Sequence, residues 1–200
     1  MKSIKLGDCA TIKIGLVLKR KEAQGDNQKN YSNVSFTLKS FTPEGVVAKE
    51  LLFPFFSSEK IHDRYLAIEQ DVVMKRTAPY TAIAINKSLD GCVVPSFFVT
   101  IRLKDTKVIN PGYLALYLNT DKVQEQLRIT ASGMTVPVIS TKSLRELYIP
   151  ILIIDKQEAL DDLNKQISKE RELIKKLLIE KENYYKASIM NILKEGQSNE

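Results

Sequence analysis

The sequence predicts an α+β fold, in which a β-rich domain with short helices is followed by one long helix. Up to residue 153, short runs of β-branched and aromatic residues alternate with Gly, Pro and Asn, which is typical of strands and turns. Beyond this point no Gly or Pro occurs until Gly196, and apolar residues recur at spacings of three, four and seven. We therefore expect a domain over 1–153, a coiled-coil helix over 154–195 and a disordered tail over 196–200.

The strands of the first half are predicted from alternating apolar and polar positions. Residues 3–14 indicate a strand or a pair of strands, and the polar stretch 19–33 indicates a long exposed loop. Residues 34–38 alternate as a half-buried strand does, and 46–56 contain another strand that Pro54 interrupts.

A second group of strands follows the segment 57–66, which suits a short helix or a loop. The expected strands are 71–76, 82–85, 91–95 and 97–103, with a turn at 77–80. The run FFVTIRL in the last of them gives the strongest signal, because it is rich in aromatic and β-branched side chains.

Three short helices are expected next, over 111–118, about 120–130 and 140–147, with a loop over 131–137 between the second and the third. Asn110 and Pro111 mark the start of the first helix, because Pro is tolerated in a first helical turn. A hydroxyl side chain at 140, 141 or 143 caps the third helix. Residues 148–150 then continue in an extended conformation.

The long helix is roughly 40 residues, or about 60 Å at 1.5 Å per residue. Its apolar stripe consists of Leu160, Leu163, Ile167, Ile174, Leu177 and Tyr184. Glu170 and Lys181 fall on the same line, so the repeat is imperfect. Because such a stripe would stay exposed in an isolated helix, we expect it to pack on a second helix. That helix would come from another copy of this chain or from a different protein.

The formal net charge of +6 is unevenly distributed. Residues 1–154 hold 21 Lys and Arg against 14 Asp and Glu, an excess of seven positive charges, whereas residues 155–200 hold 9 against 10. The whole positive excess thus lies in the expected domain. A basic domain attracts polyanions, DNA or RNA first, although charge of this size also serves general solubility.

Several classes of protein are excluded by what the sequence lacks. No apolar run approaches the ~18 residues of a membrane helix and no secretory signal opens the chain, so a cytoplasmic protein is expected. Cys9 and Cys92 are predicted to be reduced thiols, and His62 an ordinary surface residue. The common catalytic motifs are missing, and Asp71 with Lys75 lacks the acid-x-Lys element of nucleases. We therefore expect a non-catalytic protein without a metal site.

Four segments, in order along the chain, resemble the DNA specificity subunits of type I restriction-modification systems. Residues 69–77 (EQDVVMKRT) resemble that family's Gly-Asp-Ile-Leu strand, and residues 110–114 (NPGYL) its Pro-x-Tyr-Leu helix. Residues 132–150 resemble its Gly-Ser, Ile-Ser and Ile-Pro segment, and Gln157 falls where the family's IPLPPLEEQ ends. The departures are Gln70 in place of Gly, Leu152 and Ile153 in place of prolines, and Asp155 and Lys156 in place of two glutamates.

The resemblance implies one target-recognition domain and one spacer helix, where a typical subunit has two of each. Such a chain would read one half of a bipartite DNA target and direct a methyltransferase subunit and a restriction and translocation subunit to it, without enzymatic activity of its own. S-adenosylmethionine, ATP and Mg²⁺ would belong to those partners, and this chain would need no cofactor. Two copies would form a homodimer through antiparallel C-terminal helices, and the target would have symmetric halves.

The residues that we expect to contact double-stranded DNA lie in three segments. They are Lys19, Arg20 and Lys21 beside the polar loop, Lys75, Arg76, Thr77 and Tyr80 at a strand end and turn, and Ser132 and Thr135 around Gly133. Lys and Arg suit contacts with phosphates, and contacts with base edges would supply specificity. Two alternatives stay open, a stand-alone nucleic-acid-binding regulator and a coiled-coil interaction scaffold, each without restriction-modification partners.

Overall fold

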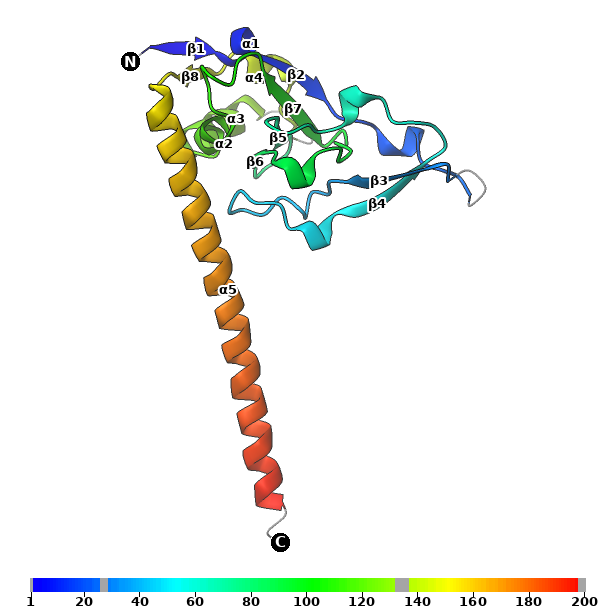
Figure 1. The fold of residues 1–200 in the computed structure, drawn as a ribbon, viewed down its shortest axis with the longest axis vertical. Coiled ribbons are helices and arrows are strands. Elements are labelled where there is room, and N and C mark those ends of the chain that lie inside the picture. The colour runs from blue at the N-terminus through cyan, green and yellow to red at the C-terminus, as the bar shows by residue number, and fades with distance from the viewer. Residues whose placement is uncertain (1, 26–28, 132–136, 198–200) are drawn as a thin grey trace. The chain divides into compact units, whose positions relative to one another are not determined.

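The structure, a computed structural model, describes residues 2–25, 29–131 and 137–197, with side chains up to Lys194. It divides into two compact units, Met1–Asp162 and Leu163–Glu200. Every strand of the described ranges lies in the first unit, and the second continues one long helix (Figure 1). The α+β fold class expected from the sequence is confirmed.

A four-stranded antiparallel sheet forms the centre of the first unit, in the order β2-β7-β5-β6. Its strands are β2 (Ala10–Ile14), β5 (Val72–Lys75), β6 (Ala82–Ala84) and β7 (Phe98–Leu103). Val72 of β5 lies opposite Ile101 of β7 on one side and Ala84 of β6 on the other. Strands expected at 71–76, 82–85 and 97–103 are therefore present, each shortened by one to two residues.

Helices cover one face of this sheet. They are α2 (Pro111–Leu118), α3 (Asp121–Ala131) and α4 (Thr141–Arg145). Alternate residues of a strand point to opposite faces, and Met74 and Ile101 pack toward these helices in a core with Leu114, Leu118 and Leu127. The predicted helix starts are confirmed at two caps. Asn110 Oδ1 accepts a hydrogen bond from the Tyr113 N–H, and Ser140 Oγ accepts one from the Ser143 N–H.

The opposite face of the sheet is covered by irregular segments rather than helices. Val73 and Phe98 point into this second core, where Phe36 and Phe41 join Phe98 in an aromatic cluster with ring centroids 4.6 to 6.2 Å apart. Short 3-10 turns η3 (Lys49–Leu51) and η5 (Lys87–Leu89) lie in these segments. The sheet is thus buried on both sides, which explains why β5 is apolar except at its last residue.

The N-terminal strand does not form a hairpin with its neighbour. Helix α1 (Leu6–Cys9) separates β1 (Ser3–Lys5) from β2, and β1 pairs with β8 (Tyr148–Pro150) instead. Residues 3–14, expected as a strand or a pair of strands, thus contain two strands, but the partner of β1 comes from the far end of the domain. This pairing joins the start of the chain to the segment immediately before the long helix.

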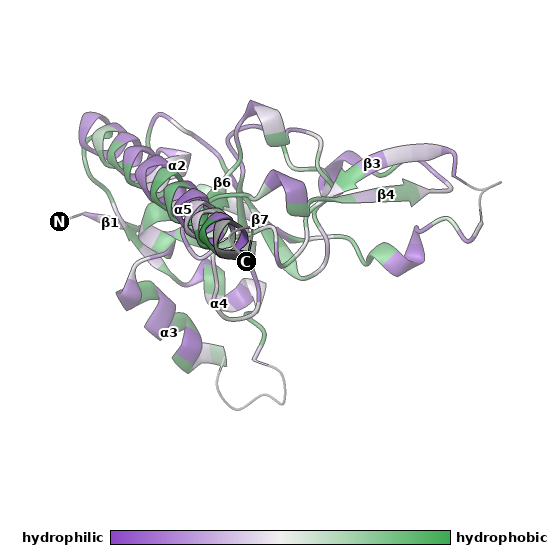
Figure 2. Ribbon diagram, turned by 90° about the horizontal axis from the view of Figure 1, so that it is seen from below, coloured by the Kyte–Doolittle hydropathy of each residue, from purple (hydrophilic) through white to green (hydrophobic). Residues whose placement is uncertain are grey.

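A second two-stranded sheet, β3 (Tyr31–Ser35) with β4 (Phe53–Ser57), lies to one side of the four-stranded sheet in both ribbon views (Figures 1 and 2). The sequence placed the first of these strands at 34–38, three residues too late. Residues 91–95, expected as a strand, make only isolated bridges, at Val93 and Pro95. Two further 3-10 turns, η1 (Leu18–Arg20) and η4 (Asp63–Tyr65), lie on either side of this ribbon in sequence.

The long helix α5 runs over Ile154–Gln197, where the sequence predicts a helix over 154–195. Its first nine residues, up to Asp162, belong to the first unit. None of the helices in the described ranges combines the length and apolar character needed to cross a membrane. In the same part of the chain, no cluster of three or more His, Cys, Asp or Glu side chains is placed to hold a metal ion.

Candidate nucleic-acid interface

The basic segment at 19–21 lies against the β3–β4 ribbon. Residues just after it extend the sheet along β4, because Glu22 bridges to Ser57 and the Ala23 N–H donates to the Phe56 carbonyl at 3.0 Å. Lys19 and Arg20 sit in η1 and are exposed to solvent. Lys21, the third member, forms an ion pair with Glu59 just beyond β4. Two of the three predicted cations therefore face solvent at the edge of the ribbon.

Side chains alternate between the two faces of the ribbon. The inner face is buried in its middle, whereas Tyr31 and Phe53, at opposite ends of this face, are 44% and 58% exposed. On its inner face Phe55 is 2% exposed and packs with Leu16, Ile61 and Val93. The outer face consists of Ser32, Val34, Pro54 and Phe56, all of them exposed, with Val34 at 47% and Phe56 at 37%. The Lys29 ammonium lies 5.1 Å from the centre of the Phe56 ring. The sequence did not predict this exposed surface, in which apolar side chains lie beside a lysine.

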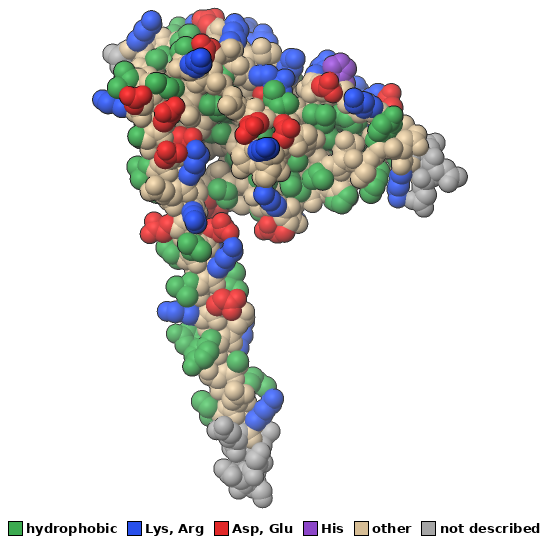
Figure 3. Space-filling view, viewed as in Figure 1, with side chains coloured by type: hydrophobic (Ala, Val, Ile, Leu, Met, Phe, Trp, Pro, Cys, Tyr) green, Lys and Arg blue, Asp and Glu red, His purple; other side chains and the backbone are tan. Residues whose placement is uncertain are grey.

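Positive charge surrounds the ribbon. The segments 16–35 and 53–66 carry Lys19, Arg20, Lys21, Lys29, Lys60 and Arg64. The acidic residues described there are Glu22, Glu59 and Asp63. Figure 3 shows basic and hydrophobic side chains mixed over this part of the surface. His62, expected to be an ordinary surface histidine, is exposed and caps η4 by accepting the Arg64 N–H at its Nδ1.

Arg76 lies where the sequence placed it, at the end of β5, and links three segments. Its Nε donates to the Ile139 carbonyl at 3.3 Å and its Nη1 donates to the Ser96 carbonyl at 3.0 Å. The Ser96 N–H in turn donates to the Leu16 carbonyl, so Arg76 lies close to the segment that leads into η1. Burial lowers the pKa of the guanidinium. Thr77, the next residue, is half-buried.

Lys75 and Tyr80 occupy interior positions. Lys75 is 8% exposed and donates to the Phe41 carbonyl at 2.8 Å, and burial lowers the pKa of its ammonium. Tyr80 is 2% exposed, and its backbone N–H and carbonyl pair with the side-chain amide of Gln124. In these places the two side chains support the turn between β5 and β6, and contact with DNA would require them to move outward. Ser132 and Thr135 lie outside the described residues.

Asp71 forms an ion pair with Arg102. Its carboxylate, 1% exposed, accepts two hydrogen bonds from Arg102, both at 2.7 Å, and a third from the Ile68 N–H at 3.0 Å. The hydrogen bond with Asp71 raises the pKa of the Arg102 guanidinium. Both carboxylate oxygens are therefore occupied by protein donors, which accounts for Asp71 as a structural residue.

The side chain of Gln157 connects the start of α5 to the rest of the domain. Gln157 is fully buried, and its Oε1 accepts the Asn110 N–H while its Nε2 donates to the carbonyls of Val108 and Leu152. One turn further along α5, the carboxylate of Asp161 occupies the place that a Cβ on Gly112 would fill. Gly112 therefore allows α5 to approach α2 closely.

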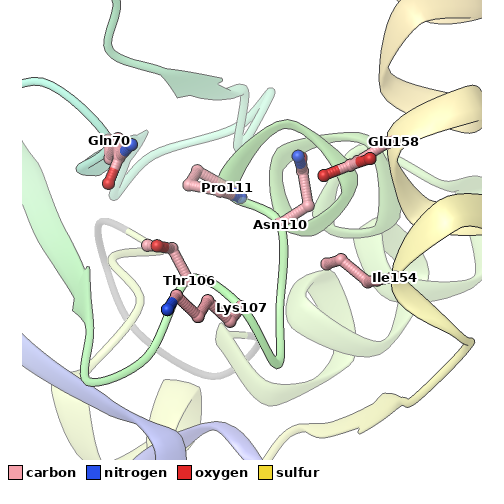
Figure 4. Close-up of a pocket in the computed structure, with 7 residues that line it drawn as sticks. All are labelled: Gln70, Thr106, Lys107, Asn110, Pro111, Ile154 and Glu158. Atoms are coloured by element: carbon pink, nitrogen blue, oxygen red, sulfur yellow. The ribbon is translucent and has the colours of Figure 1, made fainter.

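A hollow of about 490 Å³ opens beside this attachment. Figure 4 shows Gln70, Thr106 and Lys107 on one side of the hollow and Ile154 and Glu158, from α5, on the other. Gln70 adopts a positive φ of 73°, the left-handed conformation that Gly adopts more easily. At this position the resembled family usually has Gly, the residue that adopts this conformation most easily.

Beyond Asp162, α5 carries large apolar side chains in contact with solvent. Four members of the predicted stripe are 52 to 68% exposed, namely Leu163, Ile174, Leu177 and Tyr184. The other two differ: Leu160 packs against the core of the first unit, and Ile167 is half-buried. Leu178, Ile189 and Ile192 add to the exposed apolar surface at 57 to 68%. Such a surface is typical of a helix that pairs with another helix.

Comparison with solved structures shows which known proteins have a similar fold. No family model and no curated protein matches the chain. The HsdS subunit from Thermoanaerobacter tengcongensis is similar in structure, with a TM-score of 0.62 and 17% identity over 86% of this chain and 43% of that one. A chain from a structure of the type I R-M system has a TM-score of 0.56 and 17% identity over 88% of this chain and 40% of that one. The chain thus has an HsdS-like fold and spans about two fifths of the length of these chains.

Proposed function

We propose that this chain is a specificity subunit of a type I restriction-modification system that reads one half of a bipartite DNA target. The observation that carries the proposal is the structural likeness to HsdS over 86% of the chain. The ordered sequence segments from 69 to 157 support it independently, because that resemblance rests on residues rather than on backbone shape. The positive excess in residues 1–154 supports a polyanionic ligand for the domain.

Binding to DNA would combine two kinds of contact. Lys19 and Arg20 are exposed cations suited to phosphates, and Arg76 with Thr77 lies at the partly exposed turn after β5. Phosphate contacts supply affinity that does not depend on sequence, and contacts with base edges supply specificity. In this proposal Lys75 and Tyr80 support the turn from the interior of the domain. Ser132 and Thr135 remain proposed contacts in the segment between α3 and Pro137.

The long helix would serve as spacer and dimer contact. We propose that two copies pair through antiparallel α5 helices and bury the stripe from Leu163 to Tyr184, giving a two-fold symmetric reader for two symmetric half-sites. The chain would act without catalysis of its own. It would direct a methyltransferase subunit and a restriction and translocation subunit, and S-adenosylmethionine, ATP and Mg²⁺ would serve those partners.

Selection from a random duplex library with the purified chain tests the proposal. A bipartite motif with a fixed spacer is expected, together with co-purification of a type I methyltransferase subunit when the two are co-expressed. A selected motif without methyltransferase binding would support a stand-alone regulator instead. No affinity for duplex DNA at low salt, with a stable helix-mediated complex, would support an interaction scaffold.

The contribution of the basic segment can be measured separately. Replacing Lys19 and Arg20 with Ala should weaken binding to all duplex sequences and reduce the slope of log affinity against log salt by about 2, since each phosphate contact contributes about 0.9. The matched control replaces Lys107 and Lys122, which lie in the loop before α2 and on α3. An equal loss of slope in both variants would show that charge alone, and not this segment, governs binding.

A further inference from the structure

The side chains on the outer face of the β3–β4 ribbon are exposed to solvent. Strand alternation sends Phe55 into the core and leaves Phe56, its neighbour, on the outside. Two large apolar side chains, Val34 and Phe56, therefore lie in solvent on one face together with Ser32 and Pro54. Exposed apolar residues that are grouped on one surface usually mark a contact with a partner.

The ribbon is held rigidly from below. Phe55 packs with Leu16, Ile61 and Val93, and the Val93 N–H donates to the Val34 carbonyl at 2.7 Å. At the other end, Ser57 Oγ donates to the Glu59 carbonyl at 2.8 Å. The backbone that presents the outer side chains is thus attached to the domain by packing and by hydrogen bonds.

The dimensions of the ribbon suit one partner in particular. Adjacent strands lie about 4.8 Å apart, and the major groove of B-DNA, about 12 Å wide, admits a two-stranded ribbon. Lys19 and Arg20 are exposed at the β4 edge, and Lys29 lies over the Phe56 ring on the outer face. In such a complex the cations beside the ribbon would contact the phosphates that border the groove. A purely apolar partner surface would offer these cations no negative charge.

The outer face also offers suitable chemistry for reading bases. A serine hydroxyl can donate to or accept from base edges, and Phe contacts the C5-methyl group of thymine. Ser32 lies directly opposite Phe56 in the register, so a hydroxyl and an aromatic ring are presented side by side. Val34 lies two residues further along the same face of β3.

We propose that the β3–β4 ribbon enters the major groove and that Ser32, Val34 and Phe56 determine the base sequence of the half-site. This inference rests on the proposed function and adds to it the element and the side chains that discriminate bases. None of these three residues belongs to the segments that the sequence indicated as DNA-binding. The apolar pair contacts a thymine methyl group, and the flanking cations hold the ribbon in the groove.

The test compares motifs selected from a random duplex library by the full chain and by two variants. Val34→Ser with Phe56→Ser should keep affinity for random duplex DNA within about twofold and lose preference at one or two base pairs by about 5- to 100-fold. Ser32→Ala, which removes only a hydroxyl, should relax the preference at an adjacent base pair. Replacing the preferred thymine with uracil should weaken binding of the wild-type chain but not of the double variant.

Tyr148→Ser is the matched control. Tyr148 is also an exposed aromatic residue on a two-stranded antiparallel sheet under a lysine, with Lys5 Nζ 5.8 Å from its ring centre, but it lies on β8. Its selected motif should equal that of the wild-type chain. If the wild-type chain selects a motif and both ribbon variants select the same one, the ribbon does not read bases, although the proposed function stands. If the wild-type chain selects no motif, the proposed function itself fails, and this inference fails with it.

Discussion

The side-chain amide of Gln157 accepts a hydrogen bond from the backbone N–H of Asn110 at 2.9 Å, although 47 positions separate the two residues. The same amide donates to the Val108 and Leu152 carbonyls at 3.0 and 2.8 Å. One buried side chain therefore satisfies three backbone groups, two before α2 and one before α5. Asn110 itself caps α2, so the two helix starts share a single hydrogen-bond network.

Replacing Gln157 with Ala should lower the free energy of unfolding by about 2 to 4 kcal/mol, because three buried backbone groups lose their partner. Urea titration followed by far-UV circular dichroism measures the loss, which suits a chain without Trp. Gln126→Ala, at an exposed position of α3, should change stability by less than about 0.5 kcal/mol. Hydrogen exchange adds a local readout: amides of the first two turns of α5 should lose protection while those of β5 and β7 keep theirs. Uniform loss would argue against a local role.

The helices could be predicted because their signals are local. Asn110 with Pro111 starts α2, and the absence of Gly and Pro from 155 to 195 predicts α5. The ribbon could not be predicted in the same way. Tyr31 to Asn33 look like the end of a polar loop, and only pairing with β4, some twenty residues later, orders them as a strand. The β1–β8 pairing is even less local, and nothing in the sequence of residues 3–5 indicates that they pair with residues 148–150.

Lys75 shows why the candidate site was only partly predictable. A lysine at a strand end is usually exposed, and its basic neighbour Arg76 strengthened that expectation. Strand alternation places Lys75 on the same face as Val73, and the segment that contains Phe41 covers this face. Which loop covers which face depends on tertiary packing. The adjacent pair Phe55 and Phe56 did contain a usable signal, since two neighbouring strand residues cannot both face one core.

Removing the partner of Asp71 should be strongly destabilising. Arg102→Met leaves a carboxylate that is 1% exposed without its two guanidinium hydrogen bonds, and we expect a loss of about 2 to 4 kcal/mol. Adding Asp71→Asn to this variant should recover part of the lost stability, because the uncompensated negative charge is removed. A double-mutant cycle measures the coupling energy between Asp71 and Arg102. The control is Arg128→Met, whose pair with Glu125 is exposed and should contribute less than about 1 kcal/mol. Equal losses for Arg102 and Arg128 would contradict the argument.

Stability should depend on pH through Lys75. Because burial lowers the pKa of its ammonium below 10.5, the folded state binds fewer protons than the unfolded state between the lowered pKa and 10.5. The cost of burying the charge is therefore present at neutral pH and is lost as pH rises through this window. The stability of the wild-type chain relative to Lys75→Met should therefore rise as the pH increases through this window toward 10.5, and groups common to both chains cancel. A difference that falls or stays constant would exclude a buried, destabilised ammonium.

Arg76 should contribute to both stability and DNA binding, and two substitutions separate these roles. Arg76→Ala removes the bonds to the Ile139 and Ser96 carbonyls and should cost about 1 to 2 kcal/mol of stability, while reducing the salt slope of DNA binding by about 1. Arg76→Lys keeps the charge but cannot reproduce both bonds, so stability should fall while the salt slope is kept. Urea unfolding and fluorescence anisotropy at several salt concentrations measure the two quantities. An unchanged slope in folded Arg76→Ala would remove Arg76 from the interface.

The exposed stripe of α5 should control the oligomeric state. Leu177 is 57% exposed in the single chain, and burying it against a second helix would remove most of that apolar area from water. Leu177→Lys places a charge in the expected contact and should convert a dimer into a monomer in sedimentation equilibrium at about 10 μM. Asn183→Lys adds the same side chain on the opposite side of the helix, about 140° from the centre of the stripe at 100° per residue, and should leave the dimer intact. A wild-type chain that is monomeric at this concentration would mean that the stripe binds a different protein, because its apolar side chains still require a partner in a functional complex.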